Sequence, residues 1–392
     1  MRSPGAALDT PACITEHGSR NLPAAIGDAL DAVDTPALIL DLDVFERNLA
    51  TMSAAVRGTP VRLRPHAKSH KCPEIARRQI ALGAVGICCQ KVAEAEVFVA
   101  AGVRDVLITN EIVGAGKLDR LARMARLARI GVLVDDGGNV RDIAAAAARA
   151  GAEVEVLVEL DVGAHRCGVD PDAAGAPALQ LARAIAAQPA LRFGGLHAYH
   201  GGAQHLRTPD ERVHAIACAA RWAAQTKRSI EAIGIPCPTV TGAGTGSFML
   251  ERDSGVYTEL QPGSYIFMDA DYRRNEPAEG APVFAQSLFV WTSVMSRPTH
   301  DRAIVDAGLK ASSVDSGLPM VAEWPGVRFV KASDEHGVLE VDAGAKSPAL
   351  GTKLKLVPGH CDPTVNLYDW IVAVRKERVE ALWPVSARGA LL

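Results

Sequence analysis

The sequence lacks the features of an exported, membrane-spanning or nucleic-acid-binding protein. Its eight cysteines are scattered, include no CxxC pair and show no spacing that suggests a disulfide framework. No apolar run approaches the roughly 20 residues needed to span a bilayer, and residues 1–18 lack the apolar core of a signal peptide. The net charge is only −3, which gives no electrostatic case for nucleic acid or membrane. We therefore expect a cytoplasmic protein whose partners are small molecules.

The chain instead has a regular alternation of strand-like and helix-like segments. Its 392 residues are enough for a barrel plus a second domain. Apolar runs typical of strands alternate with segments of helical period. We expect strands at 61–67, 86–90, 105–110, 130–135, 153–160, 193–199, 238–242 and 257–261. This pattern predicts a (β/α)8 barrel, with a doubly wound open sheet as the alternative.

The rest of the chain divides around that barrel. Residues 1–34 are Ala- and Gly-rich and are predicted to form an N-terminal arm of unreadable function. The barrel domain is expected over 35–275 and starts with a strand at 37–40 and a helix capped by Asp43. Residues 276–392 begin with a linker and continue with β-rich runs that no long helix interrupts. We therefore expect a C-terminal, mainly-β domain.

A cluster of basic residues ends the first expected barrel strand. Within it, Lys68 is a candidate catalytic amine, flanked by Arg64, His66, His70 and Lys71. A lysine holds an aldehyde cofactor as a Schiff base only when its amine is neutral, and neighbouring cations with desolvation lower the pKa of a lysine. The alternative is a solvated basic patch, or a site for phosphate or nucleic acid.

The segment RPHAKSHK at 64–71 resembles the cofactor-lysine segment of a known enzyme family. These are the pyridoxal-phosphate enzymes of the alanine-racemase fold type, in the branch with D-threonine aldolase, 3-hydroxy-D-aspartate aldolase and D-serine dehydratase. The resemblance extends from Thr35 to Gly389. It implies a barrel that binds pyridoxal phosphate through Lys68, a β domain after it, and a homodimer with the active site near its interface.

The residues that follow the expected strands should meet on one face of the barrel, where such folds carry their active sites. Gln90, Arg166 and Tyr199 are in such positions. The resemblance implies that Gln90 and Tyr199 contact the cofactor. It also implies that Arg166 holds the phenolic oxygen of the cofactor or the carboxylate of the substrate. Each could instead be an ordinary residue of the barrel mouth.

A glycine-rich segment, Gly242-Ala-Gly-Thr-Gly-Ser247, follows the seventh expected strand. Its closely spaced N–H groups suit a doubly charged phosphate, although a simple turn is the alternative. The spacing is not that of a dinucleotide fingerprint. The resemblance implies that Thr241, Gly244 and Thr245 contact the cofactor phosphate, and that Tyr265 contacts the phosphate or the ring.

His360 and Asp362 are candidate ligands for a metal ion. On an extended backbone, residues two apart point to the same side and can share one divalent cation. Unrelated loop residues are the alternative, because a His-x-Asp pair alone is a weak motif. In the family this is the metal position. Its dehydratases pair the histidine with cysteine, whereas its aldolases pair it with aspartate. Asp362 therefore favours an aldolase with Mg²⁺ or Mn²⁺ over one with Zn²⁺.

The resemblance implies a lyase that cleaves the Cα–Cβ bond of D-3-hydroxy amino acids. His205, six residues after Tyr199 as in the aldolases, is the candidate base, alone or through a metal-bound water. The segments 88–92 and 268–272 look closest to 3-hydroxy-D-aspartate aldolase, which implies glycine and glyoxylate as products.

Three other functions stay open. They are a D-threonine aldolase, a D-serine or 3-hydroxyaspartate dehydratase, and a non-catalytic carrier of pyridoxal phosphate. A substrate with a β-carboxylate needs a further cation, for which the candidates are Arg273, Arg274, Lys310 and Arg388.

Overall fold

The computed structural model describes residues 22–171 and 176–392. Most of the expected arm, with Cys13, therefore lies outside the described residues. The seven cysteines inside them are free thiols. Within these ranges, every helix is too short or too polar to cross a membrane.

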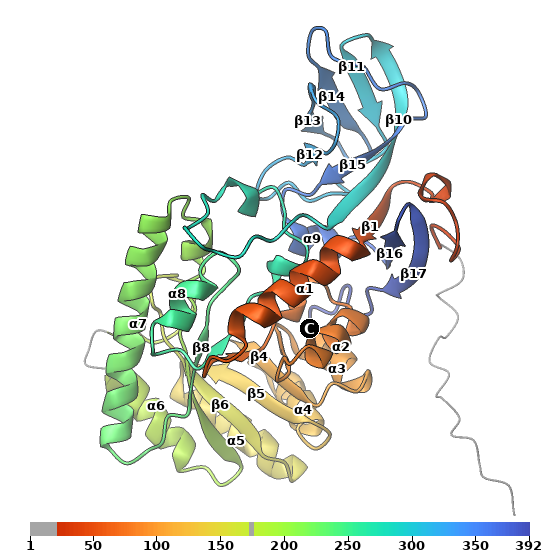
Figure 1. The fold of residues 1–392 in the computed structure, drawn as a ribbon. Helices are drawn as coiled ribbons and strands as arrows, with labels where there is room; N and C mark the ends of the chain where they lie inside the picture. Colours follow the sequence, from red (N-terminus) through yellow and green to blue (C-terminus); the bar gives the residue numbers. More distant parts are fainter. Residues whose placement is uncertain (1–21, 172–175) are drawn as a thin grey trace, which may run out of the picture.

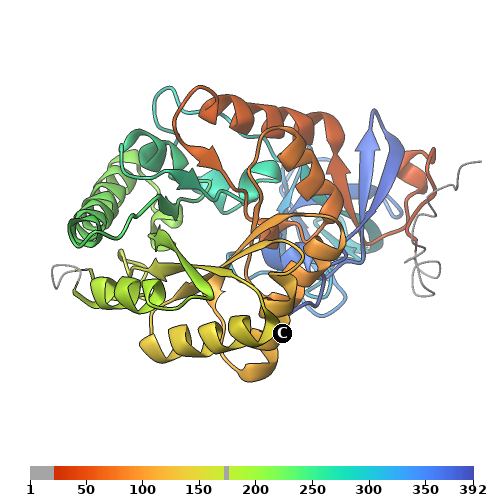
Figure 2. The ribbon, with the colours of Figure 1, turned by 90° about the horizontal axis from the view of Figure 1, so that it is seen from below.

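Eight parallel strands form a curled sheet in the order β2-β9-β8-β7-β6-β5-β4-β3. These strands are β2 (Arg62–Leu63), β3 (Ile87–Cys89), β4 (Asp105–Glu111), β5 (Arg129–Val134), β6 (Val154–Glu159), β7 (Leu191–His197), β8 (Thr239–Gly242) and β9 (Glu259–Leu260). The two edges meet through a parallel bridge between His66 and Cys88. Figure 2 shows the curled sheet from below, with helices around it. Each expected barrel segment overlaps one observed strand, so the predicted (β/α)8 barrel is confirmed and the open sheet was the wrong alternative.

Helices cover the outside of this barrel (Figure 1). They are α1 (Leu42–Val56), α2 (Pro73–Ala81), α3 (Val92–Ala100), α4 (Ala115–Met124), α5 (Gly137–Ala150), α6 (Ala176–Ala186), α7 (Pro209–Ala232) and α8 (Phe248–Asp253). Local sequence explains several of their ends. The longest, α7, starts at a capping box of Thr208 and Glu211, and α5 ends at Gly151, which has a left-handed conformation.

A second sheet lies beside the barrel (Figure 1). Its strands are β1 (Ala37–Asp41), β10 (Leu288–Thr299), β11 (Arg302–Val305), β12 (Met320–Val321), β13 (Val327–Ala332), β14 (Gly337–Val341), β15 (Lys353–Val357), β16 (Trp370–Arg375) and β17 (Arg378–Pro384). In the described part of 276–392, the only α-helix is α9 (Cys361–Val365). The predicted mainly-β region is therefore confirmed.

The strand β1 belongs to this second sheet rather than to the barrel. It pairs antiparallel with β10 and parallel with β16, far along the chain. The division of the chain into domains at residue 275 stays a prediction. The strand β1 precedes this boundary but pairs with strands that follow it. The helix after β1 is capped by Asp41, whose side chain accepts a hydrogen bond from the N–H of Val44 at 3.0 Å. The expected cap, Asp43, instead pairs with Arg375.

The helix α9, which follows β15 of the second sheet, lies at the mouth of the barrel. Pro358 and Gly359, which follow β15, accept hydrogen bonds from the backbone of Ala270 and Asp271. The N–H of Cys361 donates to the Asp269 carboxylate at 3.0 Å. The end of β15 and the start of α9 are thereby fixed against the C-terminal ends of the barrel strands.

Candidate active site

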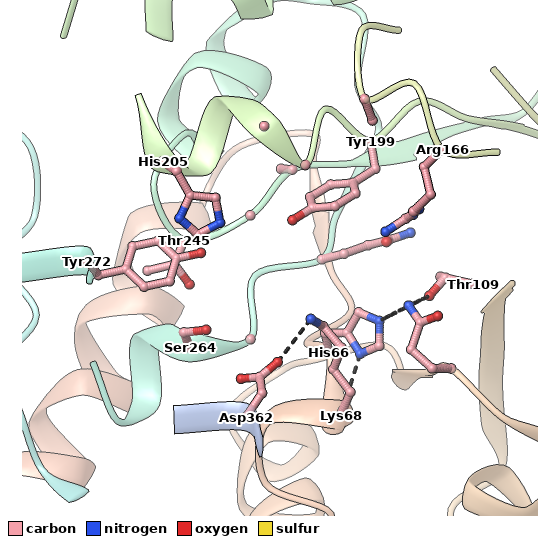
Figure 3. Close-up of a pocket in the computed structure, with 18 of the residues that line it drawn as sticks. His66, Lys68, Thr109, Arg166, Tyr199, His205, Thr245, Ser264, Tyr272 and Asp362 are labelled. Carbon is pink, nitrogen blue, oxygen red and sulfur yellow. Dashed lines mark hydrogen bonds and ion pairs between the residues drawn. The ribbon is translucent and has the colours of Figure 1, made fainter. Parts of the chain in front are cut away.

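A cavity of about 360 Å³ opens at the C-terminal ends of the barrel strands (Figure 3). This volume is in the range of small-molecule sites. All but two of the predicted site residues line it. They are Lys68, Gln90, Arg166, Tyr199, His205, Gly244, Thr245, His360 and Asp362.

Lys68 lies on a short 3-10 helix, η2 (Ala67–Ser69), and forms an ion pair across the cavity. Its Nζ is 2.9 Å from Oδ2 of Asp362. The carboxylate raises the pKa of Lys68 above its ordinary value. The predicted lowering of this pKa by neighbouring cations was therefore wrong. Those cations have other partners: the Arg64 Nε, for example, is 2.9 Å from Oε1 of Glu259.

His66, which the sequence analysis named as one of the cations around Lys68, and Thr109, which no pattern indicated, form the wall around Gln90. The Nε2 of His66 is 3.0 Å from Oγ1 of Thr109 and 3.0 Å from the amide nitrogen of Gln90. Burial and the nearby Lys68 lower the pKa of His66 well below its usual range. A neutral imidazole therefore lies beside the candidate cofactor lysine.

One wall of the cavity has hydrogen-bond donors without acceptors. The N–H groups of Gly244 and Thr245 have no acceptor among the described residues, and the Thr245 hydroxyl is buried without a partner. Leaving a buried polar group unpaired costs about 1–3 kcal/mol. A Cβ on Gly244 would lie 2.4 Å from the side-chain oxygen of Gln204, so a larger residue fits there only if the Gln204 side chain shifts. These donors fit a bound phosphate.

Two predicted phosphate contacts do not reach the cavity. The Thr241 hydroxyl accepts a hydrogen bond from the side chain of Gln261 at 2.8 Å, inside the barrel. The Tyr265 hydroxyl accepts one from Gln79 at 3.0 Å, in the core. Gln261 and Ser264 line the cavity, whereas Thr241 and Tyr265 do not, so the cofactor roles expected of these two residues stay predictions.

Arg166 and Tyr199 lie together on the opposite wall. The guanidinium carbon of Arg166 is 5.9 Å from the centre of the Tyr199 ring, and its Nη2 is 3.7 Å from Glu159. Burial raises the pKa of Tyr199, so its hydroxyl stays protonated near neutral pH. Arg166 is half-exposed and permanently charged, and can bind a carboxylate or a phenolic oxygen.

His360 is held in the way that is typical of metal-binding histidines. Its Nδ1 is 2.8 Å from Oδ2 of Asp315, while its Nε2 has no partner among the described residues. Metal-ligating imidazoles commonly donate their second N–H to a carboxylate. Asp315 lies 45 positions away in sequence, and no local motif indicated it.

Asp362 supplies the second candidate ligand. Burial alone would raise its pKa, but Lys68 and His360 lower it to about 2, so the side chain is anionic. The expected extended backbone is wrong here: His360 is extended, and the chain enters α9 at Cys361. Both residues nevertheless line the cavity. The described residues contain no cluster of three metal-ligating side chains, so water and substrate would complete the coordination.

Comparison with known proteins agrees with this architecture. The family model "Alanine racemase, N-terminal domain" matches residues 40–271, and "Putative serine dehydratase domain" matches 287–374. A D-threonine aldolase from Arthrobacter sp. is 52% identical over 94% of this chain and 96% of its own length. A 3-hydroxy-D-aspartate aldolase from Paracoccus denitrificans (strain Pd 1222) is 46% identical with the same coverage. The crystal structure of a D-threonine aldolase from Filomicrobium marinum has a TM-score of 0.92 and 52% identity, covering 95% of this chain and 100% of that one.

The fold and the cavity define an enzyme built on an alanine-racemase-like barrel. The chain belongs to the fold-type III family of pyridoxal-phosphate enzymes. Within that family it is a carbon–carbon lyase of the aldolase group.

Proposed function

We propose that this protein cleaves D-3-hydroxy amino acids between Cα and Cβ, with pyridoxal phosphate and a divalent metal ion, to give glycine and an aldehyde. The observation that carries the proposal is the arrangement of the cavity. Lys68, the unpaired donors of Gly244 and Thr245, and the candidate metal ligands His360 and Asp362 all line one cavity, and Lys68 pairs with Asp362. The aspartate, rather than a cysteine, at position 362 favours cleavage over dehydration.

The residues of the cavity have separate roles in this proposal. Lys68 would hold the cofactor aldehyde, the Gly244–Thr245 donors its phosphate, and Gln90 and Tyr199 its ring. The bound cofactor supplies an electron sink for the charge left on Cα. His360 and Asp362 would hold Mg²⁺ or Mn²⁺, and such an ion would lower the pKa of a β-hydroxyl bound to it.

The remaining residues handle the substrate and its protons. Arg166, the guanidinium on the cavity wall, binds the α-carboxylate. His205 takes the proton of the β-hydroxyl through Nε2, and Lys68 returns a proton to Cα. None of these proposed roles includes loss of the β-hydroxyl group, which a dehydration would need.

The preferred substrate in our proposal has a small, neutral β-substituent, as in D-threonine. Of the cations named for a β-carboxylate, Lys310 pairs with Glu335 at 2.6 Å and Arg388 with Asp369 at 2.8 Å. Neither these two nor Arg273 and Arg274 line the cavity. The second candidate is 3-hydroxy-D-aspartate, the substrate that the sequence resemblance favours and that the name of a 46% identical relative carries.

Product analysis tests the proposal. The protein is mixed with pyridoxal phosphate and Mn²⁺. D-threonine, 3-hydroxy-D-aspartate and L-threonine are then each added in a separate reaction. We expect glycine with acetaldehyde or glyoxylate from the D-substrates, and loss of the reaction in the presence of a chelator. Ammonia with a keto acid would assign the protein to the dehydratases. Cofactor uptake without turnover would make it a carrier.

The oligomeric state forms part of the proposal. We expect a homodimer, as is usual for this fold type, and light scattering of the purified protein checks it. A monomer that cleaves D-threonine would refute the dimer while leaving the activity intact.

A further inference from the structure

His205 is held at the edge of the cavity by one carboxylate. The residue ends the 3-10 helix η3 (Gly202–His205), and its half-exposed imidazole lies beside the Tyr272 ring, with centroids 6.1 Å apart (Figure 3). Its Nδ1 is 2.5 Å from Oδ2 of Asp271. Its Nε2 has no partner in the described part of the chain, and the residue lines the cavity. Nδ1 of His205 is therefore paired with Asp271, whereas Nε2 is available to a substrate in the cavity.

Asp271 is in turn held by two arginines. Its other oxygen, Oδ1, accepts a hydrogen bond from Nη2 of Arg207 at 2.6 Å and a second one from Arg274. The side chain of Asp271 is only 5% exposed. Burial would raise the pKa of this carboxyl, but hydrogen bonds from Arg207, His205 and Arg274 lower it. Asp271 is therefore an anion with one oxygen left for the imidazole.

An ionised carboxylate can only accept hydrogen bonds. The nitrogen that faces Asp271 must then carry the proton, so the neutral imidazole of His205 has Nδ1–H and an unprotonated Nε2. That tautomer gives His205 a lone pair on the nitrogen that is not engaged by the protein. The opposite tautomer would present an N–H to the cavity and could not accept a proton.

We propose that Asp271 is a positioning residue for the cleavage reaction, because it fixes the tautomer and orientation in which His205 Nε2 accepts the proton of the β-hydroxyl. The inference rests on the proposed function and adds to it a residue that does not touch the substrate. Asp271 keeps its own charge throughout, while the proton moves from the hydroxyl oxygen to Nε2.

Arg274 connects Asp271 to the loop that holds His360. Besides Asp271, it donates to the backbone oxygen of Ser316 at 2.9 Å. Ser316 adjoins Asp315, which holds Nδ1 of His360. Two histidine–carboxylate pairs, one on the barrel and one beside the second sheet, are thus connected through one arginine. The loop of the second sheet and the barrel loop are aligned by this contact.

The substitution Asp271→Asn tests the proposal with almost no change in shape. The two arginines need an acceptor, so the amide oxygen stays toward them and the NH₂ group faces His205. The amide then donates to Nδ1 and forces the proton onto Nε2, as in Asp→Asn variants of catalytic triads. We expect kcat for D-threonine cleavage to fall by about 10²- to 10⁴-fold, with KM changed only a few-fold.

Two further measurements separate positioning from a structural defect. Exchange of the α-hydrogen of glycine in deuterated water needs Lys68 but not His205, and should keep its rate in Asp271→Asn. Nitrogen-15 NMR of histidine-labelled, cofactor-free protein should show His205 as the Nδ1–H tautomer in the parent and the Nε2–H tautomer in the variant. The His205→Gln variant assigns the signal.

A double-variant comparison and a control complete the experiment. His205→Gln with Asp271→Asn should lose no more activity than His205→Gln alone, because the carboxylate acts only through the imidazole. Asp369→Asn removes another carboxylate paired with an arginine and should leave kcat unchanged. Full cleavage activity in Asp271→Asn, or additive losses, would refute the role of Asp271 while the proposed function stands. A parent protein that cleaves no D-3-hydroxy amino acid would overturn both.

Discussion

Substitution of Gly244 by alanine probes the cofactor wall directly. Its Cβ would stand 2.4 Å from Oε1 of Gln204, about 1 Å closer than ordinary contact. That oxygen accepts a hydrogen bond from Gly246 at 2.9 Å, and the amide nitrogen of the same side chain donates to Ser247 at 2.7 Å. Gln204 is buried, so it cannot move aside without breaking these bonds.

The size of the effect follows from these contacts. Overpacking a filled site costs about 1–3 kcal/mol, and each lost hydrogen bond about 1 kcal/mol. We expect a total of about 2–4 kcal/mol, shared between stability and cofactor binding. If all of it appeared in binding, the dissociation constant of pyridoxal phosphate would rise by about tens-fold to several-hundred-fold.

The assay for Gly244→Ala is a pair of measurements on purified protein. Thermal unfolding of the cofactor-free protein gives the stability part, and titration with pyridoxal phosphate gives the binding part. Gly116→Ala is the matched control, because a Cβ there meets nothing within 4 Å and the residue lies inside α4. It should leave binding unchanged and raise stability slightly. Parent-like melting and cofactor affinity in Gly244→Ala would refute the reasoning.

Three further outcomes are expected. Lys68→Ala should abolish cleavage and the borohydride-trapped cofactor adduct seen by mass spectrometry; an adduct that persists would assign the cofactor to another lysine. Asp315→Asn should weaken Mn²⁺ binding about 10- to 100-fold in calorimetric titration, because the imidazole of His360 loses its support, and an unchanged affinity would contradict that role. Burial raises the pKa of Glu251 to about 7, although the Ser247 hydroxyl opposes the shift. The pKa of Glu251 is higher in the folded protein than in the unfolded chain. Its contribution to the free energy of unfolding is therefore full at low pH and is lost as pH rises from about 4 through 7. Over that pH range, the free energy of unfolding of the parent should fall by up to about 3 kcal/mol relative to that of Glu251→Gln. Parallel pH profiles of the two melting temperatures would contradict the raised pKa of Glu251.

Local pattern was enough to predict the barrel and most of the cavity. The strand runs alternate with helical segments in a way that only a few folds accommodate, and the C-terminal ends of parallel strands meet at one face. A residue such as Arg166, placed just after a strand, is therefore brought to the cavity by topology alone. The resemblance of short motifs, above all the segment around Lys68, then indicated the cofactor chemistry.

Side-chain direction and pairing could not be read from the same pattern. Thr241 and Tyr265 belong to the right segments, but packing turns one into the barrel and the other into the core. The pKa of Lys68 depends on Asp362, which is 294 positions away and approaches it only when α9 docks on the barrel.

The sequence by itself therefore determined the eightfold repeat and which strand ends carry polar groups, because periodicity and turn chemistry act between near neighbours in the chain. Only the tertiary structure decided which carboxylate faces which base. It places β1 in the second sheet, Asp315 behind His360 and Asp271 behind His205. These are contacts between segments distant in sequence, and their geometry is set by how the barrel and the second sheet pack, which no local pattern encodes.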